Sequence, residues 1–300
     1  MDATERVEKR HADTSFAWYT RAMNGVAPWI AACRPGWAIL APCCVAVGSS
    51  YARFDAQPGP GLPAHLVVML GAFAAAVGVN LIDHALARAD DTPPTSHGGV
   101  GATEAAVGGG AALGLAAFCA LGLVPLSGSA PSGYGAIAVL LCATRRAPFG
   151  GLEALGRGFG ELASVVAFGP LAALAGFASQ AGTGSWGAFL AGVPAGLVAA
   201  GALVASRAEN PSAGAETPRG WEAALPLLAA AVLANAVRIG EYPPSASLAL
   251  LPLAVAAVAA WRAAAQATAN DVSRRGQLAL ACAIAALVAL VAALRLAPAD

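Results

Sequence analysis

Long apolar stretches separated by short polar links dominate this chain and leave it few ways to fold. Hydrophobic residues make up 58% of the 300 positions, and charged residues make up 11%. A soluble domain carries roughly 25% charged residues, so this chain has too little polar material to cover a surface that faces water. A helix that crosses a bilayer needs about 20 mostly apolar residues. The sequence therefore predicts an all-α, multispanning membrane protein.

We expect about nine transmembrane helices, packed around a central cavity that opens to the cytoplasmic side. Several contain glycine or proline, which membrane helices tolerate better than soluble helices do. The chain divides into a polar cytoplasmic segment, residues 1–27, and a single transmembrane domain, residues 28–300. The expected spans cover residues 36–53, 63–82, 102–124, 132–146, 161–178, 184–205, 221–239, 243–262 and 277–295.

Basic residues are distributed unevenly between the two sets of links. Of the 17 lysines and arginines, only Arg53, Arg238 and Arg295 lie on one side, and all the others lie on the side of the N-terminus. Cytoplasmic loops are enriched in Lys and Arg, so we expect a multi-pass protein of the inner (plasma) membrane with a cytoplasmic N-terminus. The net charge is zero and the cations form no patch, which argues against a nucleic-acid partner.

Ionisable residues concentrate in two of the expected cytoplasmic links. The first reads GVNLIDHALARADDTPPTSHGG, and the second reads LVASRAENPSAGAETPRGW. A charge at the bilayer centre costs at least about 2.5–3.5 kcal/mol, so these groups should lie at the membrane face or line a cavity. Mg²⁺ typically takes one or two carboxylates plus phosphate oxygens. Together the two links could hold metal ions and a diphosphate; the alternative is two ordinary solvated loops.

Three segments carry a resemblance to a known family. WIAACRPGWAILAPCC opens the first span with Arg34 and Pro35, and GVNLIDHALARADDT follows the second span. The third segment begins GRGFGEL and contains Arg157, Gly158, Gly160, Glu161, Gly169 and Pro170. In these segments the chain resembles the UbiA superfamily of intramembrane prenyltransferases. It is most similar to the branch that prenylates 1,4-dihydroxy-2-naphthoate in menaquinone biosynthesis.

The resemblance implies a site, a cofactor and two substrates. The substrates would be a polyprenyl diphosphate and an aromatic quinone precursor, and the cofactor would be Mg²⁺. Asp83 and Glu209 would be catalytic. The metal would be held by Asp83, His84, Asp90, Asp91 and Glu209. The diphosphate would be neutralised by Arg157, Arg207 and Arg219.

The first family motif, N-D-x-x-D followed by a later Asp, is only partly preserved. Without gaps, Asp83 and His84 fall on its Asn and first Asp, and Ala87 replaces the second Asp. In a shifted register, Asn80 and Asp83 fall on the two Asp positions, and Asp90 or Asp91 supplies the later acid. No register keeps every carboxylate.

The second family motif, N-N-x-R-D-x-x-x-D-x-x-x-G-K, is also eroded. Glu209 falls on its first Asp, Ala213 replaces the second Asp and Pro218 replaces the Lys. Arg207 and Arg219 each lie one position from a family cation. Loss of a carboxylate or cation removes stabilisation of the charge that develops on departing pyrophosphate. A weakened enzyme and a non-catalytic protein of the same fold, binding a lipid, quinone or partner, therefore both remain open. A small transporter is a third alternative, and the sequence leaves the oligomeric state open.

Overall fold

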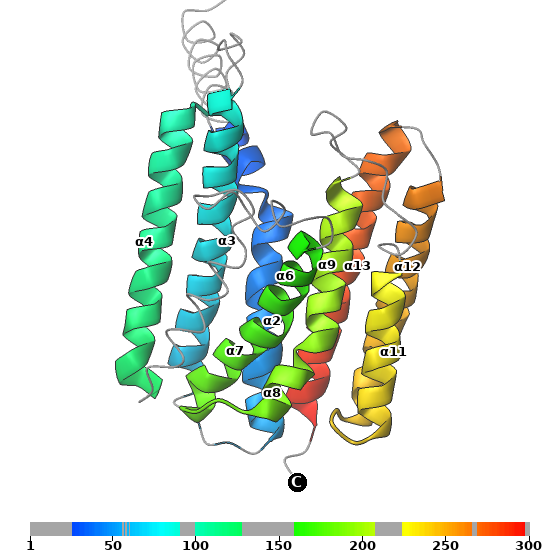
Figure 1. Cartoon of the computed structure of the whole chain (residues 1–300). Helices are drawn as coiled ribbons and strands as arrows, with labels where there is room; N and C mark the ends of the chain where they lie inside the picture. The colour runs from blue at the N-terminus through cyan, green and yellow to red at the C-terminus, as the bar shows by residue number, and fades with distance from the viewer. Residues whose placement is uncertain are drawn as a thin grey trace, which may run out of the picture.

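The chain forms a bundle of helices that run roughly side by side (Figure 1). The computed structural model describes residues 26–55, 57, 59, 61–90, 100–127, 159–207, 224–265 and 269–297. No strand occurs among these residues, so the expected all-α class is confirmed. The helices are α2 (Pro35–Phe54), α3 (Leu62–Asp90), α4 (Ala102–Ser127), α6 (Phe159–Val166), η2 (Ala167–Leu171), α7 (Ala172–Ala181), α8 (Trp186–Ala191), α9 (Val193–Arg207), α11 (Leu225–Arg238), η4 (Pro244–Ala249), α12 (Leu250–Ala265) and α13 (Ala269–Leu296).

Several of these helices are long and apolar enough to cross a bilayer. Four qualify by length and composition, and a fifth span results if the bent pair Val26–Cys33 and Pro35–Phe54 is counted as one. Shorter apolar helices cover Trp186–Ala202, Leu225–Arg238 and Pro244–Val258. Each coincides with an expected span, whereas the expected span 132–146 lies outside the described residues. The multi-pass membrane architecture is therefore confirmed.

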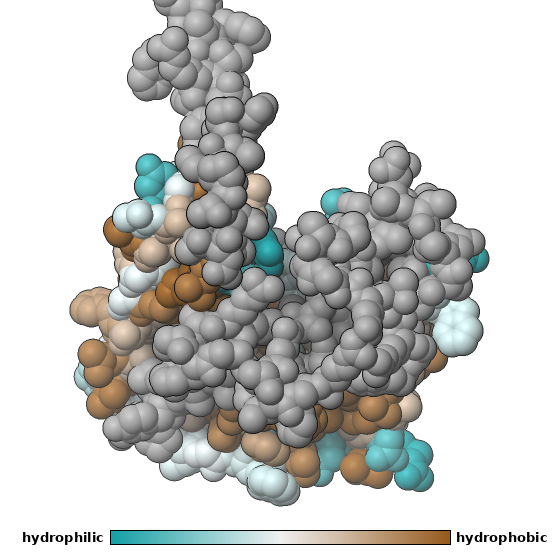
Figure 2. All heavy atoms as spheres, turned by 45° about the horizontal axis from the view of Figure 1, so that its top comes forward, coloured by the Kyte–Doolittle hydropathy of each residue, from teal (hydrophilic) through white to brown (hydrophobic). Residues whose placement is uncertain are grey.

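Side chains on the flanks of the bundle agree with this assignment. Hydrophobic side chains make up much of the visible flank in Figure 2. Phe118 and Leu121 on α4, and Leu251 on α12, each expose about 70% or more of their surface. Large exposed apolar residues at this density are unfavourable in water and favourable against lipid tails. The outer faces of these helices therefore suit a hydrocarbon environment.

A helix break at Arg34 positions the start of α2. The short helix Val26–Cys33 meets α2 at an angle of 46°, and Arg34 adopts a left-handed backbone with φ of 47°. Pro35 follows at the first helical position. Its ring lacks an N–H and disfavours the right-handed helical conformation of the residue before it. The Arg34-Pro35 pair thus turns the chain at the end of the bundle where α2 begins.

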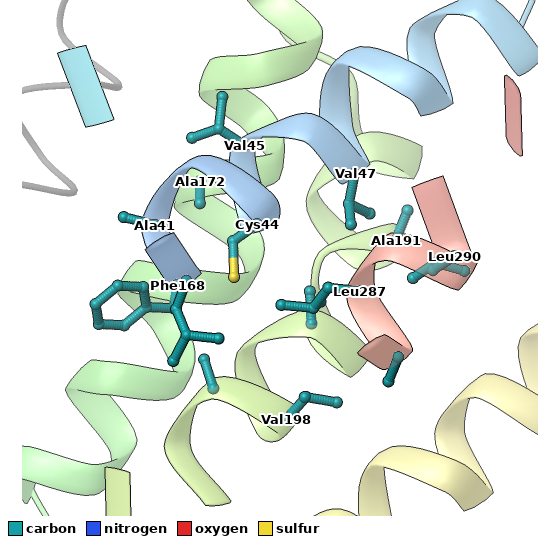
Figure 3. Packing of buried hydrophobic residues seen from close by; sticks show 14 of the residues in the cluster. Ala41, Cys44, Val45, Val47, Phe168, Ala172, Ala191, Val198, Leu287 and Leu290 are labelled. Carbon is teal, nitrogen blue, oxygen red and sulfur yellow. The ribbon is translucent and has the colours of Figure 1, made fainter. Parts of the chain in front are cut away.

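The core forms where α2 packs against α7, α9 and α13 (Figure 3). Small residues bring the backbones of α2 and α7 into direct contact. A Cβ built on Gly48 would overlap the carbonyl of Ala173, and one built on Gly176 would overlap the carbonyl of Val45. Close approach of this kind lets membrane helices gain van der Waals contacts that larger side chains would prevent. Glycine is therefore required at both positions.

A turn of π-helix interrupts the expected span 161–178. Residues Ala167–Leu171 form this turn, η2, and it contains Pro170. Proline cannot donate the backbone hydrogen bond of a regular α-helix, and a wider turn accommodates its ring. Within this turn, Gly169 packs against the backbone of Gly196 on α9. The proline therefore marks a place where two helices meet closely.

A small cavity lies on the other side of α9, among α11, α12 and α13. It is lined by apolar side chains that include Val198, Leu233 and Leu287, and its volume is about 10 Å³. This is close to the minimum that a single water molecule requires. An isoprenoid tail cannot fit there, so this cavity is not the predicted substrate cavity.

A buried tyrosine fixes the connection between α11 and η4. Tyr242 exposes 1% of its surface, and its hydroxyl donates a hydrogen bond to the carbonyl of Ala191. Burial raises the pKa of Tyr242, so the hydroxyl remains a donor at all physiological pH values. The bond ties the turn after α11 to the end of α8.

Replacing Tyr242 by Phe should lower the free energy of unfolding by about 1–3 kcal/mol, because a buried carbonyl then loses its donor. Tyr51→Phe is a matched control. The Tyr51 hydroxyl donates to Glu241 over 3.2 Å, and the exposed Glu241 carboxylate can bind water instead. Unfolding in detergent, followed by circular dichroism, measures both variants. Equal effects of the two substitutions would contradict the role of the Ala191 bond.

Candidate functional site at the ends of α3 and α9

The two helices that precede the acidic links end at the same end of the bundle. Figure 1 shows α3 and α9 both finishing at its upper end, where α2 and α13 begin. α3 extends through Asp90 and carries the first cluster on its last turns, while α9 ends at Arg207, next to the second cluster. We call this end of the bundle, which includes Asp83 on the last turns of α3, the candidate site.

Asp83 is paired in this structure. Its Oδ2 lies 3.7 Å from Nη1 of Arg34, and the two side chains expose 28% and 51% of their surface, respectively. An ion pair this open to solvent contributes at most about 1 kcal/mol. The ion pair therefore places a cation beside the Asp83 carboxylate but contributes little to the stability of the fold.

Two further groups surround Asp83 on the same stretch of α3. Asn80 lies one turn before it and donates from Nδ2 to the carbonyl of Cys33, over 2.9 Å. This carbonyl precedes the helix break at Arg34, so α3 holds the break through both Asn80 and Asp83. His84 follows Asp83, and its Nε2 is buried without a hydrogen-bond partner among the described residues. A buried polar atom without a partner is costly, which makes His84 Nε2 an available ligand or donor.

The described side chains do not form a metal site by themselves. Among them, no three His, Cys, Asp or Glu residues lie close enough together to hold a metal ion. Asp83 supplies one carboxylate, and the neighbouring His84 nitrogen is a poorer ligand for Mg²⁺ than oxygen is. On the next turn of α3, Ala87 offers no ligand atom. The described side chains are therefore too few for a Mg²⁺ site. Such a site needs additional carboxylates from residues whose side chains the structure does not describe.

Most of the other expected ligands lie outside the described residues. This applies to Asp91, Arg157, Glu209 and Arg219, whose positions the structure does not describe. Asp90 and Arg207 are described only as the last residues of α3 and α9, and Glu161 only as part of α6; nothing is known of their side chains. The roles expected for these residues, and the cationic partner expected for Glu161, therefore stay predictions.

α3 and α9 are not direct neighbours in the bundle. α3 packs mainly against α4 and α2, and α9 packs against α6, α11 and α13. α2 touches both of them. A diphosphate bound by both acidic clusters would therefore lie over the start of α2, close to Arg34.

Sequence reasoning noted Arg34 only as a family signature and assigned it no role in the site. The Arg-Pro pair itself could have indicated that Arg34 belongs to the site. Proline predicts a helix break, and a break at the membrane face turns a side chain toward the neighbouring helix. The partner, Asp83, lies 49 residues further along the chain. Only the packing of α2 against α3 brings the two together.

The bundle is similar to a solved structure of a membrane enzyme. The two superpose with a TM-score of 0.55, over 91% of this chain and 99% of the other, at 13% sequence identity. That structure was determined in a study of digeranylgeranylglyceryl phosphate synthase in membranes. The chain therefore shares the fold of that structure. No protein-family model and no curated protein matches the sequence.

Proposed function

We propose that this protein is an intramembrane prenyltransferase of the UbiA type, which transfers a polyprenyl group from its diphosphate to an aromatic quinone precursor. The observation that carries the proposal is the shared fold, which covers 91% of the chain. A second observation is that Asp83 lies on the last turns of α3, which finishes at the same end of the bundle as α9 (Figure 1).

In the proposed reaction, the bond between the allylic carbon and the diphosphate oxygen breaks, and pyrophosphate leaves. The allylic carbon forms a new bond to the acceptor, which gives up a proton. Mg²⁺, when bound, would neutralise the negative charge that develops on the leaving group. Asp83, His84, Asp90, Asp91 and Glu209 are the proposed ligands, and Arg157, Arg207 and Arg219 are the proposed phosphate contacts.

A non-catalytic protein of the same fold, binding a lipid, a quinone or a partner, is the second candidate. It is favoured by Ala87 and Ala213, which stand where the family has carboxylates, and by the pairing of Asp83 with Arg34. Asp and Glu nevertheless persist near both motif positions, which favours a surviving, weakened activity.

Purified protein in lipid nanodiscs tests the proposal. It is mixed with a polyprenyl diphosphate and either 1,4-dihydroxy-2-naphthoate or geranylgeranylglyceryl phosphate, with Mg²⁺, Mn²⁺ or a chelator. The second acceptor is included because the structural neighbour is a digeranylgeranylglyceryl phosphate synthase. We expect metal-dependent product with the aromatic acceptor, detected by mass spectrometry. Product with the glyceryl phosphate alone would reassign the acceptor. No turnover with any chain length would favour the non-catalytic candidate.

A further inference from the structure

A polar cluster lies at the opposite end of the bundle, where α2 and α13 end and α3 begins (Figure 1). It consists of Ser49 and Ser50 on α2, His65 on α3 and Arg295 on α13. The two serines expose 2% and 0% of their surface. His65 precedes Asp83 by 18 residues of one helix, which corresponds to about 27 Å along its axis. The cluster therefore has no part in the candidate site.

The His65 ring lies between Ser49 and Arg295. The Ser49 hydroxyl donates to the carbonyl of Ala46 over 3.1 Å, and its Oγ lies 2.7 Å from Nδ1 of His65. Ser49 and His65 therefore share one hydrogen bond between α2 and α3, whose direction depends on the tautomer of the ring. Nη2 of Arg295 lies against the same ring, 3.4 Å from Nδ1 and 3.3 Å from Nε2.

Arg295 is thus held at two of its nitrogens. In addition to the contact with His65, its Nε donates to Ser50 Oγ over 3.1 Å. A guanidinium group has five N–H donors, and no described residue accepts a hydrogen bond from Nη1. These two contacts fix the plane of the group and leave one edge without a partner among the described side chains.

The positive charge of Arg295 has no carboxylate counter-charge in the part of the chain that the structure describes. No ion pair joins Arg295 to a carboxylate among the described residues. Arg53, in the last turn of α2, adds a second positive charge that acts on Arg295. Charged side chains within membrane spans are rare and usually paired. The C-terminal end of α13 stabilises a cation by about 0.3–1 kcal/mol. This electrostatic effect supplies no hydrogen-bond acceptor for the remaining N–H groups of Arg295.

Exposed leucines flank the cluster. Leu62 and Leu66 lie on either side of His65 along α3, and Leu296 follows Arg295 on α13; all three expose more than half of their surface. Arg295 is in the last turn of the span Gln277–Leu296, which is the depth at which lipid phosphates lie. A cation thus lies beside exposed apolar side chains. A ligand that has both a phosphate and alkyl chains matches this arrangement better than a free phosphate ion does.

We propose that Arg295 binds the phosphate of an anionic phospholipid through the unoccupied edge of its guanidinium group, with His65 and Ser50 holding that edge in place. Arginine recognises phosphate through two parallel hydrogen bonds, which is the geometry that a fixed guanidinium plane offers. The acyl chains lie against the exposed leucines of α3 and α13. The site is independent of the proposed prenyl transfer.

Lipid retention and thermal unfolding of the purified protein in detergent test this proposal. Phosphatidylglycerol should stay bound in native mass spectrometry and raise the unfolding temperature more than phosphatidylcholine does. Inorganic phosphate at the same concentration should have no such effect. Arg295→Gln should weaken phosphatidylglycerol retention by at least about tenfold. Arg238→Gln, which alters an exposed arginine at the same end of the bundle, should retain the lipid as the wild type does.

A second variant keeps the test decisive if Arg295→Gln fails to fold. Ser50→Ala removes only the acceptor that fixes Arg295 Nε, and it should weaken retention by about fivefold. Equal retention of the two lipids by the wild type would overturn the proposal. So would unchanged phosphatidylglycerol retention in Ser50→Ala or in folded Arg295→Gln. An equal effect of inorganic phosphate would overturn the assignment to a lipid.

Discussion

Asp83→Asn should lower metal-dependent prenyl transfer by about 10²–10³-fold, the loss that follows removal of one essential charge-stabilising contact. The effect should be large because the neighbouring carboxylate of the family is already absent at Ala87. Asparagine keeps the shape of the side chain, and the solvent-open ion pair with Arg34 contributes little to stability. The protein should therefore fold normally. Product formation at saturating substrate, measured by mass spectrometry, gives the ratio to wild type.

The matched control is Asp55→Asn. Asp55 is an exposed carboxylate that follows α2, at the end of the bundle away from the candidate site, and its loss should leave turnover unchanged. Glu209→Gln should resemble Asp83→Asn, because Glu209 falls on the first Asp of the second motif. A folded Asp83→Asn protein that keeps more than half of the wild-type turnover would show that Asp83 does not contact the reacting diphosphate.

Gly48→Ala should destabilise the bundle by about 3 kcal/mol or more, at or above the upper end of ordinary overpacking. The added Cβ would overlap the backbone carbonyl of Ala173, which cannot rotate away as a side chain can. α2 and α7 would have to move apart, and this interface is part of the main core. Equilibrium unfolding in mixed detergent, followed by circular dichroism, measures the change in the free energy of unfolding.

Gly110→Ala on α4 provides the control for this substitution. No described atom lies within 4 Å of a Cβ at Gly110, and alanine favours a helix over glycine by about 1 kcal/mol. This variant should be as stable as the wild type or slightly more stable. If Gly48→Ala also leaves stability unchanged, the close contact between α2 and α7 is wrong.

Hydropathy predicted where the chain enters and leaves the apolar layer, but it did not predict where helices end. The second span was expected over residues 63–82, whereas α3 continues to Asp90. The segment after residue 82 is polar and still rich in good helix formers such as Ala, Leu and Arg. Helix propensity does not require an apolar environment, so α3 extends beyond the stretch that hydropathy marks. This extension carries Asp83 and His84 on ordered backbone.

Contacts between distant segments were beyond the reach of the sequence. Gly48 and Gly176 each occur in an apolar run rich in small residues, and nothing in either run indicates which neighbour comes close. The pairing of Arg34 with Asp83, and that of Arg295 with His65, also depend on which helices are adjacent. The resemblance to a family supplied the fold, and the charge pattern predicted the links that could hold a site. The geometry within those links follows from tertiary packing, which composition and spacing do not encode.

We propose that the acidic cluster on the last turns of α3 and the one that follows α9 bind one diphosphate. A double-mutant cycle tests it directly, using the affinity of a non-reacting prenyl thiodiphosphate analogue in Mg²⁺ for the wild type, Asp83→Asn, Glu209→Gln and the double variant. Residues that share a ligand show coupling energies of about 0.5–3 kcal/mol, whereas distant and independent sites are additive within about 0.3–0.5 kcal/mol. We expect clear coupling, with the double variant binding better than the sum of the two losses implies. Additive losses, or an affinity that neither substitution changes, would contradict a shared diphosphate site.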